Sequence, residues 1–404
     1  MAVDERALER AVAAVVDREL ELTLEEAGMV HSVDVRRHRA EIVLALPVSP
    51  WPSEEELRQR VAQVASTVPG VREAAVGVGL MADADRDVLR ARLRRRMAGD
   101  ATTGADADTD AAQHDGAQHD AAGAAPDHGH AHGGQARPTP SFLLPGSKTR
   151  VVGISSGKGG VGKSSVTVNL AIALSKAGKR VGILDADVYG FSVPKMVGAD
   201  HDPVVIGDLV VPVVCHGIRV LSMGFFVPDD TPVIWRGPML HKAIEQFLSD
   251  AYWGDPDFLL VDMPPGTGDV TLSLAQYMAR AEVLVVTTPQ PAAQRVAQRS
   301  AFAARKLKLS VRGVVENMSW FTADDGTRYE LFGRGGGQAL ADDLGVPLLG
   351  QVPLVPALRE GGDEGVPVAL GEPDGEAARA FDALAEALLG MGPARVYRRE
   401  LSVR

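Results

Sequence analysis

The chain has 404 residues, more than one hydrophobic core usually serves, so we expect two or three domains. Its 42 basic and 53 acidic side chains give a formal net charge of −11, which argues against a general nucleic-acid-binding protein, because such proteins present basic surface. The lone cysteine, Cys215, excludes an intramolecular disulfide and fits a reducing compartment. No signal-peptide pattern and no apolar run of about 18 residues is visible, so the sequence predicts a cytoplasmic protein without membrane association.

Residues 1–97 are expected to form a small α+β domain. The predicted elements are a helix over 8–16, strands over 33–36 and 40–45, a helix over 54–64 and a strand over 71–78. Ser53 is a plausible N-cap for the second helix. An order of helix, strand, strand, helix, strand is typical of an α+β domain.

A change in composition separates this domain from the rest. Residues 98–140 are rich in Ala, Asp, Gly and His with almost no large apolar side chains, so we interpret them as a disordered linker. A metal-binding tract is the alternative to a solvated spacer for the linker histidines, His114, His119, His128, His130 and His132. A basic run lies just before the linker and consists of Arg90, Arg92, Arg94, Arg95 and Arg96. We interpret it as the solvated face of a helix in preference to a binding patch.

Residues 141–392 alternate predicted strands and helices. Strands are predicted over 150–155, 180–185, 218–223, 257–262, 282–288, 311–317 and 346–351. This alternation is typical of an α/β fold with a parallel, doubly wound sheet. Residues 393–404 are left as a C-terminal tail.

A glycine-rich loop follows the first strand of this larger domain. Residues 157–164 read GKGGVGKS and match the phosphate-binding pattern G-x-x-x-x-G-K-[ST], between a predicted strand and a predicted helix, which is the context that supports such a match. Glycines let backbone N–H groups face phosphate oxygens, and the positive end of the next helix adds to the attraction. In this pattern Lys163 reaches the β- and γ-phosphates and the Ser164 hydroxyl ligates Mg²⁺. The sequence therefore predicts a P-loop NTPase sheet.

Carboxylates follow two other predicted strands. Residues 258–262 read FLLVD, the Walker-B pattern, whose Asp262 is expected to hold Mg²⁺ or its water. The backbone N–H of Gly266, shortly after, is expected to reach the γ-phosphate. Asp187 follows the strand that ends at Asp185, at the carboxyl edge of the sheet where ligands bind, so it is a candidate for positioning the attacking water.

These motifs together resemble a specific family. The P-loop with its extra lysine, Lys158, resembles the deviant Walker A motif of the MinD/Mrp group of P-loop ATPases. Resemblance to the Mrp/ApbC family within that group lies in residues 185–194 (DADVYGFSVP), 232–238 (PVIWRGP), 261–269 (VDMPPGTGD) and 315–319 (VENMS). Members of that family are ATP-dependent iron–sulfur cluster carriers or scaffolds. The resemblance covers about residues 141–390, and the N-terminal part resembles the iron–sulfur-assembly-associated domain often fused in front of bacterial members.

The resemblance implies a homodimer that binds ATP with Mg²⁺, hydrolyses it slowly, and serves iron–sulfur apo-protein clients or assembly factors. It implies that Lys158 reaches the partner's nucleotide, that Asn317 contacts the adenine edge, and that Pro353 packs near the base. The expected catalytic residues are Lys158, Lys163 and Asp187, and the expected magnesium ligands are Ser164 and Asp262. The expected nucleotide-binding residues are Gly157, Gly159, Gly160, Val161, Gly162, Lys163, Ser164, Ser165, Gly266, Asn317 and Pro353.

The chain departs from the family where a cluster would be held. The family carries a C-x-x-C pair shortly after the segment ENMS, so that two subunits supply four thiolates. Here residues 320–333 read WFTADDGTRYELFG, and residues 324–326 indicate a tight turn between short strands. Trp51 stands before Pro52 where the associated N-terminal domain usually has a cysteine. Cys215 is interpreted as a buried structural thiol.

Three functions stay open on the sequence. The first is a homodimeric ATPase in iron–sulfur cluster assembly or carriage, whose cluster, if held, uses atypical or borrowed ligands. The second is a nucleotide-switched dimeric adaptor without a cluster, which the missing cysteines favour. The third is a MinD/ParA-like positioning protein, the least favoured because residues 394–404 are short for a membrane-binding amphipathic helix.

Overall fold

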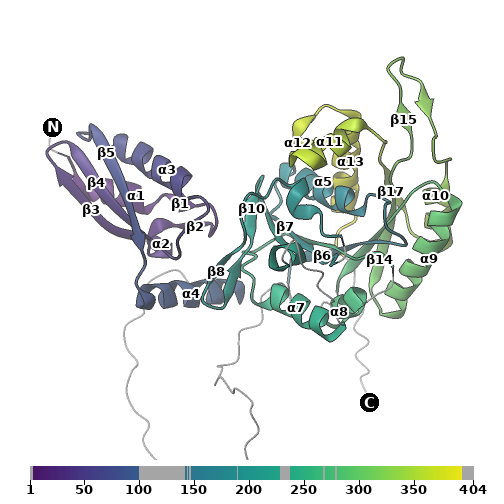
Figure 1. The fold of residues 1–404 in the computed structure, drawn as a ribbon, viewed down its shortest axis with the longest axis horizontal. Coiled ribbons are helices and arrows are strands. Elements are labelled where there is room, and N and C mark those ends of the chain that lie inside the picture. The colour runs from purple at the N-terminus through teal and green to yellow at the C-terminus, as the bar shows by residue number, and fades with distance from the viewer. Residues whose placement is uncertain are drawn as a thin grey trace, which may run out of the picture.

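The computed structural model describes residues 3–99, 142, 144, 147–188, 190–227, 237–266, 269–277 and 280–393. These residues form an N-terminal domain (residues 3–99) and a P-loop domain (residues 147–393) that lie side by side (Figure 1). The predicted histidine tract and the tail from residue 394 onward lie outside the described residues. Among the residues described, no helix is both long and apolar enough to cross a bilayer.

The N-terminal domain contains the predicted core of two helices on a three-stranded sheet. Its elements are α1 (Glu5–Ala13), β1 (Val16–Asp17), β2 (Leu22–Thr23), α2 (Leu24–Ala27), β3 (Val30–Arg36), β4 (Arg39–Leu46), α3 (Glu54–Ser66), β5 (Glu73–Leu80) and α4 (Asp83–Met97). The sheet order is β3-β4-β5, and alternate residues of β4 are buried, as expected for a strand with one face on the core. Ser53 precedes α3 as predicted, but its side chain makes no capping hydrogen bond.

The P-loop domain begins at β6 and ends with α13. Its elements are β6 (Arg150–Ser156), α5 (Lys163–Lys176), β7 (Val181–Asp185), α6 (Val193–Met196), β8 (Val204–Ile206), β9 (Leu209–Val211), β10 (Val213–Cys215), β11 (Ile218–Ser222), η2 (Met223–Phe226), α7 (Gly237–Ser249), β12 (Phe258–Asp262), α8 (Asp269–Tyr277), β13 (Glu282–Thr287), α9 (Pro291–Lys306), β14 (Ser310–Glu316), β15 (Phe321–Thr322), β16 (Arg328–Tyr329), α10 (Gly336–Leu344), β17 (Leu348–Gln351), α11 (Pro356–Glu364), α12 (Val368–Gly371) and α13 (Glu376–Gly390).

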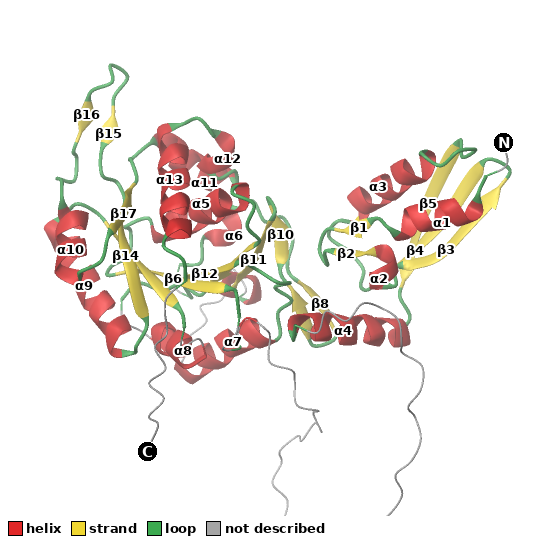
Figure 2. Cartoon of the chain, turned by 180° about the vertical axis from the view of Figure 1, so that it is seen from behind, coloured by secondary structure: helices red, strands yellow, loops and turns green. Residues whose placement is uncertain are grey.

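The main sheet confirms the predicted doubly wound α/β fold. Its order is β10-β11-β7-β12-β6-β13-β14-β17, and every pairing is parallel except the edge pair β10–β11. Helices α7 to α10 share an apolar cluster with one face, and α5, α12 and α13 share another with the opposite face (Figure 2). Because both faces are covered, strands such as β6, β7 and β12 are buried along their whole length. The carboxyl ends of these parallel strands lie at the same edge of the sheet, and the candidate site lies at that edge.

The basic run near the end of the N-terminal domain corrects one prediction. These arginines lie on α4, but the helix face is not simply solvated. Arg94 forms an ion pair of 2.8 Å with Asp208, in the turn of the β8–β9 hairpin, and Arg90 lies 3.9 Å from the same carboxylate. Sequence spacing could not reveal this pairing, because its partners belong to different domains.

Candidate nucleotide-binding site

The loop between β6 and α5 lines a cavity of about 540 Å³, within the usual size range of ligand sites. The lining includes seven residues predicted to bind nucleotide, namely Gly159, Gly160, Val161, Gly162, Lys163, Ser164 and Ser165. Lys158 and Asp187 also line it. The backbone therefore brings the loop and the aspartate segment after β7 to one cavity.

Glycine is required at specific positions of this loop. Gly160 and Gly162 have φ values of +78° and +77°, in the left-handed region that side-chain-bearing residues rarely adopt. A Cβ atom at Gly157 would lie 2.2 Å from the backbone nitrogen of Ala297 on α9. Gly159 differs, because nothing lies within 4 Å of a Cβ built there.

We expect Gly157→Ala to lower the free energy of unfolding by about 1–3 kcal/mol, since the added methyl group overpacks against the α9 backbone. Gly159→Ala is the matched control in the same loop and should leave that free energy within about 0.5 kcal/mol of wild type. Urea unfolding of both variants measures the difference. Equal stability of the two variants would contradict the close packing of Gly157 on α9.

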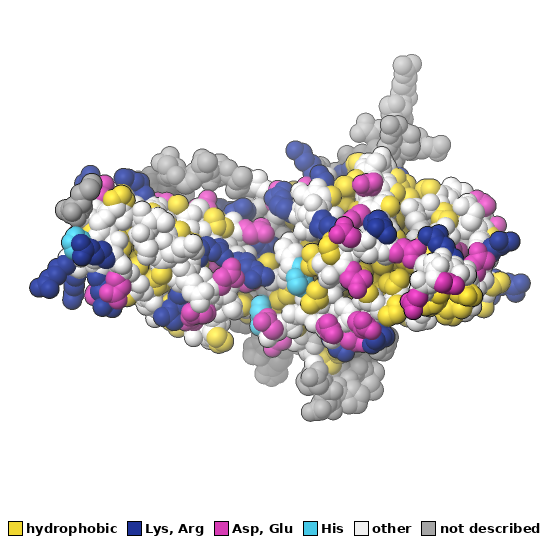
Figure 3. Space-filling view, turned by 90° about the horizontal axis from the view of Figure 1, so that it is seen from above, with side chains coloured by type: hydrophobic (Ala, Val, Ile, Leu, Met, Phe, Trp, Pro, Cys, Tyr) yellow, Lys and Arg dark blue, Asp and Glu magenta, His cyan; other side chains and the backbone are white. Residues whose placement is uncertain are grey.

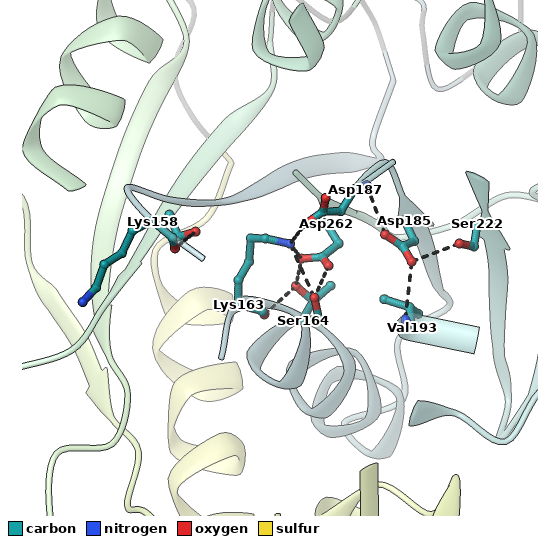
Figure 4. Close-up of polar contacts among 10 residues, drawn as sticks. Lys158, Lys163, Ser164, Asp185, Asp187, Val193, Ser222 and Asp262 are labelled. Carbon is teal, nitrogen blue, oxygen red and sulfur yellow. Dashed lines mark hydrogen bonds and ion pairs between the residues drawn. The ribbon is translucent and has the colours of Figure 1, made fainter. Parts of the chain in front are cut away.

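Lys163 lies between two carboxylates at the bottom of the cavity (Figure 4). Its Nζ is 2.8 Å from Asp262 Oδ1 and 3.4 Å from Asp187 Oδ2. The Ser164 hydroxyl donates to Asp262 Oδ2 at 2.5 Å. The structure thus brings together four residues that the sequence placed in the site from three separate motifs.

Thr167 is a polar contact of Asp262 that the sequence analysis missed. Its buried hydroxyl can donate to Asp262 Oδ1 at 2.9 Å or to the Lys163 carbonyl oxygen at 3.0 Å. The position could have been found, because Thr167 is one helical turn beyond Ser164. Thr167 holds the carboxylate of Asp262 from the α5 side.

Asp185 fixes the segment that carries Asp187. Its Oδ1 accepts the Asp187 backbone N–H at 3.2 Å, and its Oδ2 accepts the Val193 backbone N–H at 3.4 Å and the Ser222 hydroxyl at 3.0 Å. Burial, and then the neighbouring Asp262 carboxylate, raise the pKa of Asp185 to about 7. One buried side chain therefore ties β7 to β11 and to the start of α6.

Lys158 points away from the Lys163 cluster (Figure 4). Its Nζ donates to Gln290 Oε1 at 3.3 Å, a residue just before α9. Although Lys158 lines the cavity, its side chain is directed toward Gln290 and not toward Asp187 and Asp262.

The remaining predicted residues lie around the loop with different partners. Asn317 donates from Nδ2 to the Val161 carbonyl oxygen at 2.9 Å, and its buried Oδ1 has no hydrogen-bond partner in the described part of the chain. The Gly266 N–H donates to the Ser156 carbonyl oxygen at 2.9 Å, not toward the cavity. Pro353 is buried after β17 and is not among the cavity-lining residues. Their roles toward a nucleotide stay predictions.

The predicted tight turn at residues 324–326 lies in a short hairpin, as expected. Strands β15 and β16 pair in antiparallel fashion, and the Gly326 N–H donates to the Ala323 carbonyl oxygen at 2.8 Å in the turn. Glu376, at the start of α13, anchors the hairpin by accepting from Trp320, Thr322 and Arg328. Among the described residues, no group of three or more His, Cys, Asp or Glu side chains is placed to hold a metal ion.

Cys215 is buried at the end of β10, as the sequence interpretation expected. Burial raises the pKa of its thiol to about 11. At neutral pH the thiolate, which is the form that ligates metal, is therefore disfavoured.

Comparisons with known proteins agree with this geometry. A family model described as NUBPL iron-transfer P-loop NTPase matches residues 147–389, and one described as iron-sulfur cluster assembly protein matches residues 5–78. A protein of Mycobacterium leprae named iron-sulfur cluster carrier protein is 40% identical over 96% of this chain and 96% of its own length. A Deinococcus radiodurans protein of the same name is 38% identical over 95% of this chain and 94% of its own length.

A solved structure of an Archaeoglobus fulgidus nucleotide-binding protein in complex with ADP is 34% identical, with a TM-score of 0.49, and the match covers 57% of this chain and 91% of that one. The family model for the P-loop domain spans more than half of the chain, and the relatives match nearly all of it. The resemblance drawn from the motifs is therefore confirmed. The chain belongs to the ParA family of NUBPL iron-transfer P-loop NTPases.

Proposed function

We propose that this protein binds and slowly hydrolyses ATP as a cytoplasmic homodimer, and that it acts in iron–sulfur cluster assembly or in carriage of clusters to apo-proteins. The observation that carries the proposal is the position of Lys163, between Asp187 and Asp262 at the bottom of the P-loop cavity. Phosphoryl transfer needs a phosphate cradle, a metal site and a group that positions water, and the closeness of Lys163, Ser164, Asp187 and Asp262 supports this proposal.

Ser164 and Asp262 fit a magnesium ion by their chemistry, because Mg²⁺ prefers hydroxyl and carboxylate oxygens, and their oxygens already approach to 2.5 Å. Bound there, Mg²⁺ would neutralise charge on the phosphates. Lys163 would leave its two carboxylate partners to reach the β- and γ-phosphates. That exchange frees the Asp187 carboxylate from Lys163, so Oδ2 can accept a hydrogen bond from the attacking water.

The direction of Lys158 supports a dimer. Its Nζ is held toward Gln290 and not toward the carboxylate cluster of its own chain. A lysine that lines the cavity rim but does not enter its own site suits a role in a second subunit's site. Slow turnover by a single subunit follows from this arrangement.

The iron–sulfur cluster would be cargo, and this chain offers little to hold it. One chain contains a single cysteine, so a dimer offers two thiolates where four are usual. The buried Cys215 thiol has a raised pKa, which disfavours even those two. The second candidate, a nucleotide-switched adaptor without a cluster, rests on this observation together with the anchored β15–β16 hairpin.

Anaerobic reconstitution of the full-length protein with iron and sulfide tests the two candidates. For a carrier we expect visible absorbance of a cluster and iron bound to the dimer, lowered in Cys215→Ser if that thiol is a ligand. ATP hydrolysis is measured on the same samples. Bound iron below one per dimer with intact hydrolysis would reject carriage by this chain alone and favour the adaptor.

A further inference from the structure

The P-loop domain contains a surface that holds one short loop of the N-terminal domain. This seat is formed by Arg219 on β11 and Tyr252 after α7. It holds residues 18–21, between β1 and β2, which we call the docking loop. Arg219 Nη1 donates to the Glu19 carbonyl oxygen at 2.7 Å, and Tyr252 donates to the Leu20 carbonyl oxygen at 3.1 Å. In return, Arg18 donates to the Val214 carbonyl oxygen of β10 at 2.9 Å.

Burial shows that these contacts belong to the packed interior. Arg219 and Tyr252 are 4% and 0% exposed, and the guanidinium lies 5.2 Å from the centre of the tyrosine ring. A buried guanidinium is costly without acceptors, and the docking loop supplies a carbonyl oxygen and the carboxylate of Glu21 at 3.3 Å. Without the loop, these polar groups would lose their partners.

Apolar packing extends the same contact along α4. The apolar cluster of the N-terminal domain continues into the β8–β9 hairpin through Val204, Ile206, Leu209 and Val211, and it includes Tyr252. Figures 1 and 2 both show α4 alongside β8, and the space-filling view in Figure 3 shows the two domains in contact. The N-terminal domain is therefore docked on the P-loop domain through a shared core as well as through the docking loop.

The strand under this seat leads to the nucleotide site. Arg219 and Ser222 lie on the same strand, β11, which pairs in parallel with β7 so that Ser222 lies opposite Asp185. The Ser222 hydroxyl donates to Asp185, and Asp185 accepts the backbone N–H of Asp187. A displacement at either end of β11 thus reaches the other end through one short strand.

On the proposed function, nucleotide binding would change the contacts at that end. In the structure the docked loop occurs together with a Lys163 that is paired with Asp187 and Asp262. A bound nucleotide needs Lys163 at its phosphates, so both pairs must be exchanged and the Asp187 segment loses one of its anchors. Coupling between two sites needs an element that can take two arrangements, and the Asp187 segment is the candidate for that element.

We propose that docking of the N-terminal domain and binding of nucleotide oppose each other within one chain. Docking favours the arrangement in which Lys163 is paired with the carboxylates. Nucleotide binding then loosens the docking loop, and loosening the loop tightens nucleotide binding by the same factor, as linkage requires. The coupling rests on the proposed nucleotide binding but needs neither hydrolysis nor a cluster.

Arg18→Ala in the full-length protein tests the coupling from the N-terminal side. Arg18 is partly exposed and distant in sequence from the P-loop, and its truncation removes its hydrogen bond to Val214 and its ion pair with Glu56. Arg58→Ala is the matched control, because Arg58 bonds Val76 and Glu55 within the N-terminal domain and away from the docking loop. We expect Arg18→Ala to bind MgADP at least about threefold more tightly than wild type, and Arg58→Ala to bind like wild type.

Hydrogen exchange of the docking loop gives the reciprocal measurement. MgADP should speed exchange of the loop amides in wild type by a similar factor, and Tyr252→Phe should speed it without nucleotide. The coupling is overturned if Arg18→Ala binds MgADP with unchanged or weaker affinity and if MgADP does not change the hydrogen-exchange rate of the docking-loop amides. If wild type binds no nucleotide, the proposed function fails as well, so the two failures are distinguishable.

Discussion

We expect Lys163→Ala to weaken MgADP binding about 100-fold. The Lys163 ammonium is the group placed to meet the phosphates, and hydrogen bonds to charged groups contribute about 1.5–3 kcal/mol each, with 1.4 kcal/mol for each factor of ten. The backbone cradle and the Ser164 hydroxyl remain, so residual binding should persist. Titration calorimetry with MgADP measures the change.

Two controls keep this result interpretable. Removing Lys163 leaves Asp187 and Asp262 without a cation that both now contact, so thermal unfolding must show that the variant is folded at the temperature of titration. Lys158→Ala removes the other lysine of the same loop, which contacts Gln290 instead. It should bind MgADP like wild type but lose most hydrolysis. Affinity within threefold of wild type in Lys163→Ala would remove Lys163 from the phosphate site.

The larger fold could be predicted from sequence because its signals are local. Strands β6, β7 and β12 are continuous apolar runs, as expected for strands buried on both faces, and each structural boundary lies within one residue of its prediction. The glycine-rich segment 157–164 is recognisable as well, because glycine is the residue that readily adopts the left-handed backbone found at Gly160 and Gly162.

The contacts between elements could not be predicted in the same way. Arg219 meets the docking loop about 200 residues earlier in the chain, and Arg94 meets Asp208 across the domain boundary. No periodicity or motif marks such pairs, because each is fixed by the tertiary arrangement alone. The docked N-terminal domain and its path to Asp185 through β11 are therefore findings of the structure, whereas the P-loop is visible in the sequence.

We expect Asp187→Ala to lower the rate of ATP hydrolysis by about 100- to 1000-fold while ATP binding is kept or tightened. Loss of a group that positions or accepts a proton typically costs a factor of this order. Binding should not suffer, because Lys163 contacts Asp187 at 3.4 Å in the structure and would have one fewer carboxylate to leave before it reaches the phosphates. Single-turnover release of phosphate, with affinity measured separately, distinguishes the two effects.

Asp382 on α13 is a surface carboxylate that pairs with Lys176 at the C-terminal end of α5, and it supplies the matched control. Asp382→Ala should change neither rate nor affinity. Asp187→Asn then separates two roles of the catalytic side chain. An amide oxygen can still accept a hydrogen bond from water but cannot take its proton. Partial activity in Asp187→Asn would assign Asp187 to orienting the water, whereas loss as complete as in Asp187→Ala would assign it to accepting the proton. A rate within threefold of wild type in Asp187→Ala would contradict both roles.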